Sequence, residues 1–135
     1  MKNGNKLHVQ TLFLIGFLVG EYLLGMLTNL LVSSPEGGAD WQQWEFARTQ
    51  LPVMAHVILG LLLLVGSIVV CIWAFRAEDR TWKIASGIGL GSILLAIVSG
   101  SEFISSQRDY YSLVMSLLLI AAITAYAWGI YETKQ

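Results

Sequence analysis

Two glutamates and a histidine lie within long apolar stretches of this sequence, and they are the first candidates for chemistry. Glu21 lies near the middle of the first stretch, His56 near the start of the second, and Glu102 near the end of the third. A carboxyl group surrounded by hydrocarbon costs several kcal/mol unless it is paired, hydrated or protonated. Glu21 is therefore predicted either to hydrogen-bond a neighbouring helix or to take part in proton, ion or cofactor chemistry.

A polar stripe continues from Glu21 towards the end of its apolar stretch. Gly25 follows one helical turn later and leaves space beside the carboxyl group, and Thr28 and Asn29 follow two turns later on the same side. The stripe predicts polar contacts inside the membrane, and a proton or small-solute conduit along Glu21 is one interpretation. A chain of 135 residues would line such a pore only as an oligomer.

The imidazole of His56 adds a proton carrier or a cofactor ligand to these residues. Asn29, His56 and Glu102 are expected at similar depth in the membrane, where they would form one cluster. Imidazole beside a carboxylate suits a proton relay, or a heme ligand with its hydrogen-bond acceptor. The alternative is that His56 is a hydrogen-bonding residue at the membrane interface. His8 lies at the opposite edge of the membrane, so the two histidines are not expected to bind one heme.

Four apolar stretches must position these residues, and their lengths indicate helices that cross a membrane. The chain is 56% hydrophobic and 13% charged, about half the charged share of a soluble domain. A helix rises about 1.5 Å per residue, so the 25 residues of the second stretch are long enough to cross roughly 30 Å of hydrocarbon. We predict one all-α domain, an integral membrane four-helix up-down bundle over residues 1–135. Its spans are expected at about 9–32, 51–75, 82–104 and 110–131, with an outer interfacial segment at 36–50 that carries Trp41, Trp44 and Phe46.

The basic residues set the expected orientation, because cytoplasmic loops of membrane proteins carry an excess of lysine and arginine. The two termini and the turn after the second span hold six basic residues, whereas the other two connections hold two, Arg48 and Arg108. Both termini are therefore predicted to lie in the cytoplasm, in a multi-pass protein of the cell membrane. The six residues are Lys2, Lys6, Arg76, Arg80, Lys83 and Lys134.

Glycines spaced four residues apart predict faces on which helices pack closely. Gly16 and Gly20 form such a pair in the first span, Gly87 and Gly91 form another in the third, and Gly25 continues the first face. These faces fit simple helix packing or contact with a membrane-protein partner. A face flattened for a planar cofactor or a lipid tail is the alternative.

Several functional classes find no support in the sequence. The net charge is −1, which gives no reason to expect a nucleic-acid partner. The single cysteine, Cys71, allows neither an internal disulfide nor a cysteine-based metal site, and it is interpreted as a small buried apolar residue. The sequence contains no nucleotide-binding loop, catalytic-triad order or HExxH motif, so we predict no catalytic residues and no metal site.

The chain resembles one four-helix half of the heme A synthase family. The resemblance lies in the small residues of the first span, the polar loop with Trp41 and Trp44, and the sequence AHVILG at the start of the second span. It implies a four-helix heme-binding bundle in which His56 is a heme ligand. The fourth span has no histidine, and Ser116 is its nearest polar residue at comparable depth. A second axial histidine would therefore have to come from another copy.

Three functions follow from these observations. The first is a small non-enzymatic membrane protein, an accessory or packing subunit of a larger membrane complex or a homo-oligomer that associates through glycine faces. The second is a b-type heme or quinone-binding redox protein with His56 as ligand. The third is a proton or small-solute conduit that uses Glu21.

Overall fold

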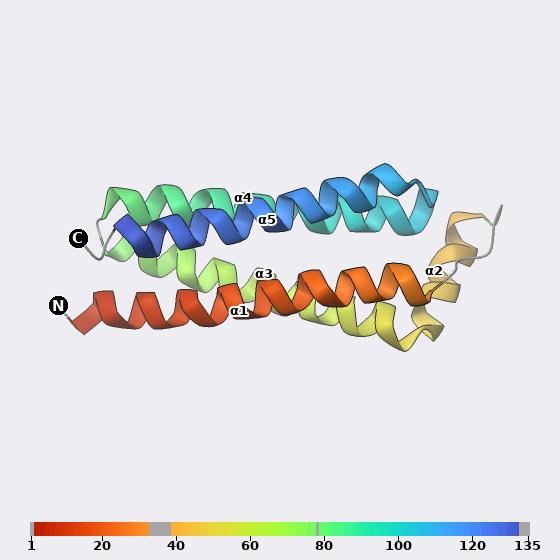
Figure 1. Ribbon diagram of the computed structural model, residues 1–135, viewed down its shortest axis with the longest axis horizontal. Helices are drawn as coiled ribbons and strands as arrows, with labels where there is room; N and C mark the ends of the chain where they lie inside the picture. The colour runs from red at the N-terminus through yellow and green to blue at the C-terminus, as the bar shows by residue number, and fades with distance from the viewer. Residues whose placement is uncertain (1, 33–38, 78, 133–135) are drawn as a thin grey trace.

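The protein is built from four long helices and one short one (Figure 1). The computed structural model describes residues 2–32, 39–77 and 79–132, with side chains from residue 6 onward, and it contains no strand within these ranges. The helices are α1 (Lys2–Leu31), α2 (Asp40–Thr49), α3 (Leu51–Arg76), α4 (Arg80–Ser106) and α5 (Asp109–Glu132). The prediction of an all-α fold with four long apolar helices is confirmed.

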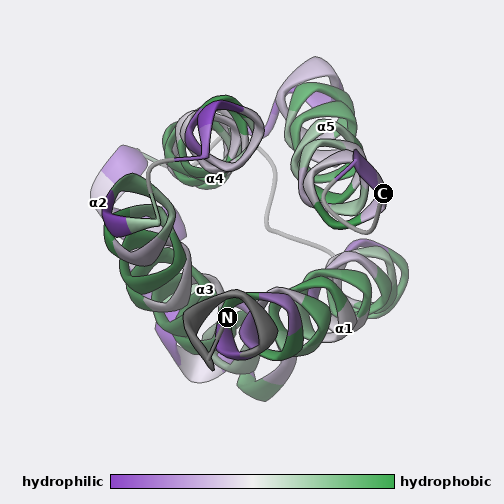
Figure 2. Ribbon diagram, turned by 90° about the vertical axis from the view of Figure 1, so that its left-hand side faces the viewer, coloured by the Kyte–Doolittle hydropathy of each residue, from purple (hydrophilic) through white to green (hydrophobic). Residues whose placement is uncertain are grey.

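The four long helices run up and down, and each packs against its neighbours in the sequence. α1 packs on α3, α3 on α4 and α4 on α5, and α5 returns to contact α1 (Figure 2). α1 begins and α5 ends at one end of the bundle, here called the terminal end, and α2 lies at the other end, the α2 end (Figure 1). Which end faces the cytoplasm stays a prediction.

The outer surface of the bundle is apolar, as a lipid-facing surface must be. Each of the four long helices is long and apolar enough to cross a membrane. Large side chains such as Phe13, Phe17 and Leu62 are 56–66% exposed, far more contiguous apolar surface than water-soluble monomers present. The fold therefore fits a multi-pass integral membrane protein.

Local signals in the sequence explain where the helices begin and end. Pro52 lies in the first turn of α3, where a missing N–H leaves no hydrogen bond unmade. Asp79 caps α4, because its Oδ1 accepts hydrogen bonds from the backbone N–H groups of Thr81 at 2.8 Å and Trp82 at 3.2 Å. Gln107, with φ of 53°, ends α4 in the left-handed region and allows a short turn into α5.

Two glycines in α4 and α5 let these helices approach closely. Tyr126 is fully buried, and a Cβ on Gly89 would collide with its ring. A Cβ on Gly129 would stand 3.0 Å from the Cβ of Ala85 and 3.2 Å from the ring of Trp82. Close approach of backbones is the usual way in which membrane helices gain contact area.

Two helices have bounds that differ from those of the predicted membrane segments, whose positions in the membrane stay a prediction. α1 begins at Lys2, before the predicted span of about 9–32, so the helix includes the polar residues that precede this span. Leu7 is buried there and its carbonyl accepts a hydrogen bond from Thr11 Oγ1 at 2.8 Å, which ties this turn to the core. The predicted interfacial segment 36–50 corresponds to α2 from residue 40, and residues 36–38 lie outside the described residues.

Candidate binding cavity beneath α2

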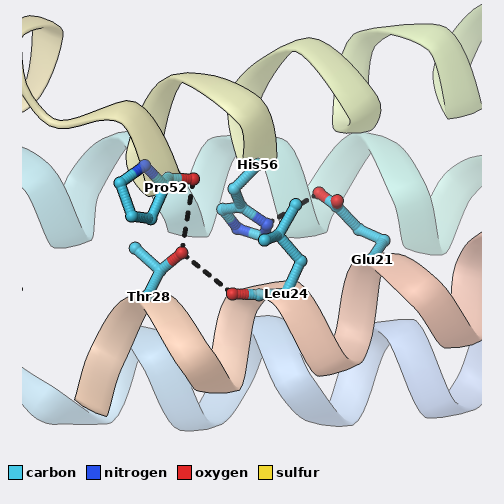
Figure 3. Close-up of polar contacts among 5 residues, drawn as sticks. All are labelled: Glu21, Leu24, Thr28, Pro52 and His56. Carbon is cyan, nitrogen blue, oxygen red and sulfur yellow. Dashed lines mark hydrogen bonds and ion pairs between the residues drawn. The ribbon is translucent and has the colours of Figure 1, made fainter. Parts of the chain in front are cut away.

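A buried ion pair joins α1 to α3. Glu21 Oε1 lies 2.9 Å from His56 Nδ1, and the two side chains are 6% and 17% exposed. Figure 3 shows the carboxylate and the imidazole facing each other between the two helices. A charge of this kind is tolerated inside hydrocarbon when it is paired, so the ion pair explains how α1 can carry Glu21.

Each partner of the ion pair lies against a glycine of the opposite helix. A Cβ on Gly25 would stand 3.1 Å from His56 Cε1, and a Cβ on Gly60 would stand 3.1 Å from Glu21 Oε1. Gly25 follows Glu21 by four residues, and Gly60 follows His56 by four residues. In an antiparallel helix pair this spacing sets the two glycines diagonally across from each other, so both helices leave room for the charged side chain of the other.

Thr28 connects the same two helices nearer the α2 end, two turns beyond Glu21 on α1. Its hydroxyl donates to the carbonyl of Leu24 at 2.8 Å and also reaches the carbonyl of Pro52 at 3.4 Å (Figure 3). The first contact satisfies the hydroxyl within α1, and the second joins it to the first turn of α3. The predicted polar stripe thus contacts α3 at Glu21 and Thr28.

The ion pair lines a cavity of about 180 Å³ in the α2 half of the bundle. Most of its wall is apolar, with aromatic or thioether side chains contributed by α2, α4 and α5. Glu21 faces this space, and its Oε2 is buried and has no hydrogen-bond partner among the residues that the structure describes. The aromatic and thioether side chains of the wall include Trp44, Phe46, Phe103 and Met115.

α2 closes the cavity at the end of the bundle. Gln43 and Ala47 are buried on the inner side of α2. Trp41, Glu45 and Arg48 lie on its exposed side. Trp44 Nε1 donates a hydrogen bond to Ser105 Oγ at 3.1 Å, which fastens α2 to the end of α4. The predicted interfacial segment is therefore an amphipathic cap whose inner side lines the cavity.

Of the three residues expected to cluster at the α2 end, Asn29 and His56 line the cavity, whereas Glu102 does not. His56 pairs with Glu21, and Asn29 Nδ2 donates to Ser112 Oγ of α5 at 2.7 Å. Glu102 is exposed and does not line the cavity. Residues at the same depth in the membrane come into contact only when their side chains face each other, and that depends on the rotation of each helix about its axis.

The predicted glycine faces divide into two groups. Gly25 packs against His56 as described above. Among the residues that the structure describes, no atom lies within 4 Å of where a Cβ would stand on Gly16, Gly20, Gly87 or Gly91. These four therefore do not pack helices together within one chain, and their faces point outward.

No metal centre is evident in the described parts of the chain. They hold no group of three or more His, Cys, Asp or Glu side chains that could share a metal ion. His8 lies at the terminal end, where its ring meets that of Trp82 edge to face at a centroid distance of 5.3 Å. It is far from His56, as the sequence predicted.

The Glu21–His56 pair and the role of Gly60 were missed by sequence reasoning. The signal that could have found them is the shared spacing of an ionisable residue and a glycine four positions later, in two helices joined as an antiparallel hairpin. Ser105, which holds the α2 cap, carries no comparable signal. Comparison with protein-family models, curated proteins and solved structures finds no match to this chain.

Proposed function

We propose that this protein binds a small lipid-soluble molecule with a ring-shaped polar head, of the quinone class, in the cavity beneath α2. The observation that carries the proposal is the Glu21–His56 ion pair on the wall of a mostly apolar cavity. Small-molecule sites typically combine apolar walls with a few polar groups that orient the ligand. An ion pair is a costly way to hold two helices together, since apolar side chains of similar size often do so equally well.

The size and walls of the cavity support a single ring. Its volume of about 180 Å³ is slightly larger than the roughly 150 Å³ of an engineered apolar cavity that binds benzene. Trp44, Phe46 and Phe103 offer aromatic surfaces, and rings stack favourably on such surfaces. Met115 adds a thioether, which also packs well against rings.

A b-type heme fits this cavity less well than a single ring. Pockets for drug-sized ligands measure about 300–1,000 Å³, and a porphyrin needs more than the 180 Å³ found here. His56 directs Nδ1 at Glu21, and its Nε2 lies 3.6 Å from where a Cβ on Gly25 would stand. The heme ligation by His56 that the family resemblance implies would therefore require α1 and α3 to separate.

A conduit along Glu21 also has less support than ligand binding. Leu14, Leu18 and Tyr126 fill the core on the terminal side of Glu21, and each is at most 6% exposed. Protons or solutes would have to pass these side chains to reach the terminal end. A ligand that stops at the ion pair needs no such path.

Tryptophan fluorescence tests the proposal, because Trp44 lines the cavity. Titration of the purified protein in detergent with a short-chain benzoquinone should give saturable quenching. Gly25→Ala should weaken binding, since a Cβ 3.1 Å from His56 Cε1 forces the imidazole to move. Gly20→Ala is the matched control on the same helix, with no described atom within 4 Å. Non-saturable quenching of the wild type, or an equal loss in both variants, would contradict the proposal.

We also propose that the protein associates within the membrane, as an accessory subunit of a larger complex or as a homo-oligomer. The supporting observation is that the glycine pairs of α1 and α4 have open space beside them, as far as the described residues extend. Faces of this kind let a second helix approach closely. Leucine at Gly20 and Gly91 should reduce the mass of the particle extracted from the native membrane in mild detergent. An unchanged mass would contradict the association.

A further inference from the structure

We infer that the cavity selects the hydroxyl-bearing, reduced form of its ligand, so that a hydroquinone binds more tightly than the corresponding quinone. This preference rests on the proposed function and adds to it which head-group chemistry the site accepts. It follows from a comparison of the hydrogen-bond donors and acceptors around the cavity.

Glu21 supplies a buried acceptor in the cavity wall that has no hydrogen-bond partner among the described residues. Glu21 is 4% exposed, and its Oε1 is taken up by His56 Nδ1 at 2.9 Å. Its Oε2 is buried without a hydrogen-bond partner among the described residues. A carboxylate oxygen accepts hydrogen bonds and cannot donate them. A ligand that satisfies this atom must therefore bring an O–H or N–H group.

Several donors in the cavity wall are, by contrast, already engaged. Asn29 Nδ2 donates to Ser112 Oγ at 2.7 Å, and Trp44 Nε1 donates to Ser105 Oγ at 3.1 Å. Three further side chains of the wall donate to backbone carbonyls of their own helix segment, each at 2.8 Å. They are Thr28, which donates to Leu24, Ser101, which donates to Val98, and Gln107, which donates to Ile104. A quinone carbonyl can only accept hydrogen bonds and leaves Glu21 Oε2 unsatisfied, whereas a ring hydroxyl can both accept and donate.

The imidazole lies against one oxygen of Glu21 and not against the other. His56 Nδ1 is 2.9 Å from Oε1, and Oε2 has no hydrogen-bond partner among the described residues. A quinone oxygen placed beside Oε2 would set two acceptors against each other. A ring hydroxyl in the same place would donate its O–H to Glu21 Oε2, so that both groups would have a hydrogen-bond partner.

The preference has a measurable size. A buried charged acceptor left without a donor loses a hydrogen bond that typically changes affinity by about tenfold or more. Calorimetric titration under anaerobic conditions should therefore give a dissociation constant about tenfold lower for a short-chain hydroquinone than for its quinone. The dimethyl ether of the same hydroquinone lacks both hydroxyl donors and should lose the tenfold gain. This ligand series keeps the protein unchanged.

Glu21→Gln provides the matching change in the protein. The amide carries both a donor and an acceptor, so the ratio of quinone to hydroquinone dissociation constants should fall towards one. Gly20→Ala should keep the wild-type ratio. Saturable binding in which the quinone or the dimethyl ether equals the hydroquinone would overturn the inference and leave the proposed function standing. Absence of saturable binding for every ring would overturn the proposed function itself.

Discussion

At the scale of single residues, two glycines make a buried ion pair between membrane helices sterically possible. Gly25 and Gly60 each leave the volume that the opposite charged side chain occupies, with 3.1 Å separating that side chain from where a Cβ would stand. Side chains at either position would separate Glu21 from His56. We therefore treat the four residues as one structural unit.

Gly60→Ala should destabilise the protein. The new Cβ would stand 3.1 Å from Glu21 Oε1, and forced repacking in a tight interior typically costs about 1–3 kcal/mol. The thermal unfolding midpoint in detergent should fall accordingly. Gly87→Ala is the control, because its Cβ would meet no described atom within 4 Å. Equal midpoints for the two variants would contradict the packing described here.

His56→Ala should destabilise the protein more than the double variant that also carries Glu21→Gln. Removal of one partner leaves an unpaired buried charge, which typically costs about 3–5 kcal/mol. Replacement of the carboxylate by an amide removes that charge, so the second change should restore part of the lost stability. Chemical or thermal unfolding of the wild type, both single variants and the double variant gives the interaction free energy between Glu21 and His56. Strictly additive losses would show that the two side chains do not interact.

At the scale of elements, a side-chain hydrogen bond from Trp44 to Ser105 fastens α2 to α4. Ser105→Ala removes the acceptor of Trp44 Nε1, and loss of a neutral hydrogen bond costs about 1 kcal/mol. Amide hydrogen exchange over residues 40–49 should therefore rise about fivefold. Ser101→Ala is the control, because its hydroxyl donates to Val98 within α4. An unchanged exchange rate in α2 after Ser105→Ala would show that apolar contacts alone hold the cap.

The helices themselves were largely predictable from the sequence, and their rotation was not. Long apolar stretches predict membrane helices because backbone amides in hydrocarbon must pair within their own segment. The rotation of each helix about its axis decides which side chains meet, and hydropathy says little about it when nearly every face is apolar. Glu102 was expected beside His56 for its depth, yet it points away from the cavity. Glu21 was expected in a polar stripe, and its partner was found only in the structure.

At the scale of the whole molecule, the bundle presents apolar side chains outward and keeps its polar groups in the core and at the ends. α1 begins and α5 ends at the end opposite α2 (Figure 1). The excess of basic residues at this end predicts that it faces the cytoplasm.

Cysteine labelling in intact cells tests this orientation. In a Cys71→Ser background, Glu45→Cys on the exposed side of α2 should react with a membrane-impermeant maleimide from outside. Lys6→Cys at the terminal end should react only after the membrane is permeabilised. Labelling of Lys6→Cys alone in intact cells would show that the protein has the opposite orientation. Labelling of both would contradict an up-down bundle with its two ends on different sides of the membrane.

The location of the bound ring is the most direct test of the central claim that the cavity beneath α2 is a ligand site. A short-chain benzoquinone with a photoreactive azide can be cross-linked to the protein in lipid nanodiscs and mapped by mass spectrometry. We predict labelling at residues that line the cavity from α2 and α4, such as Trp44, Phe46 and Phe103, and loss of that labelling with excess unmodified ligand. Labelling confined to lipid-facing residues such as Phe13 or Leu62, or labelling that excess ligand does not reduce, would contradict the claim.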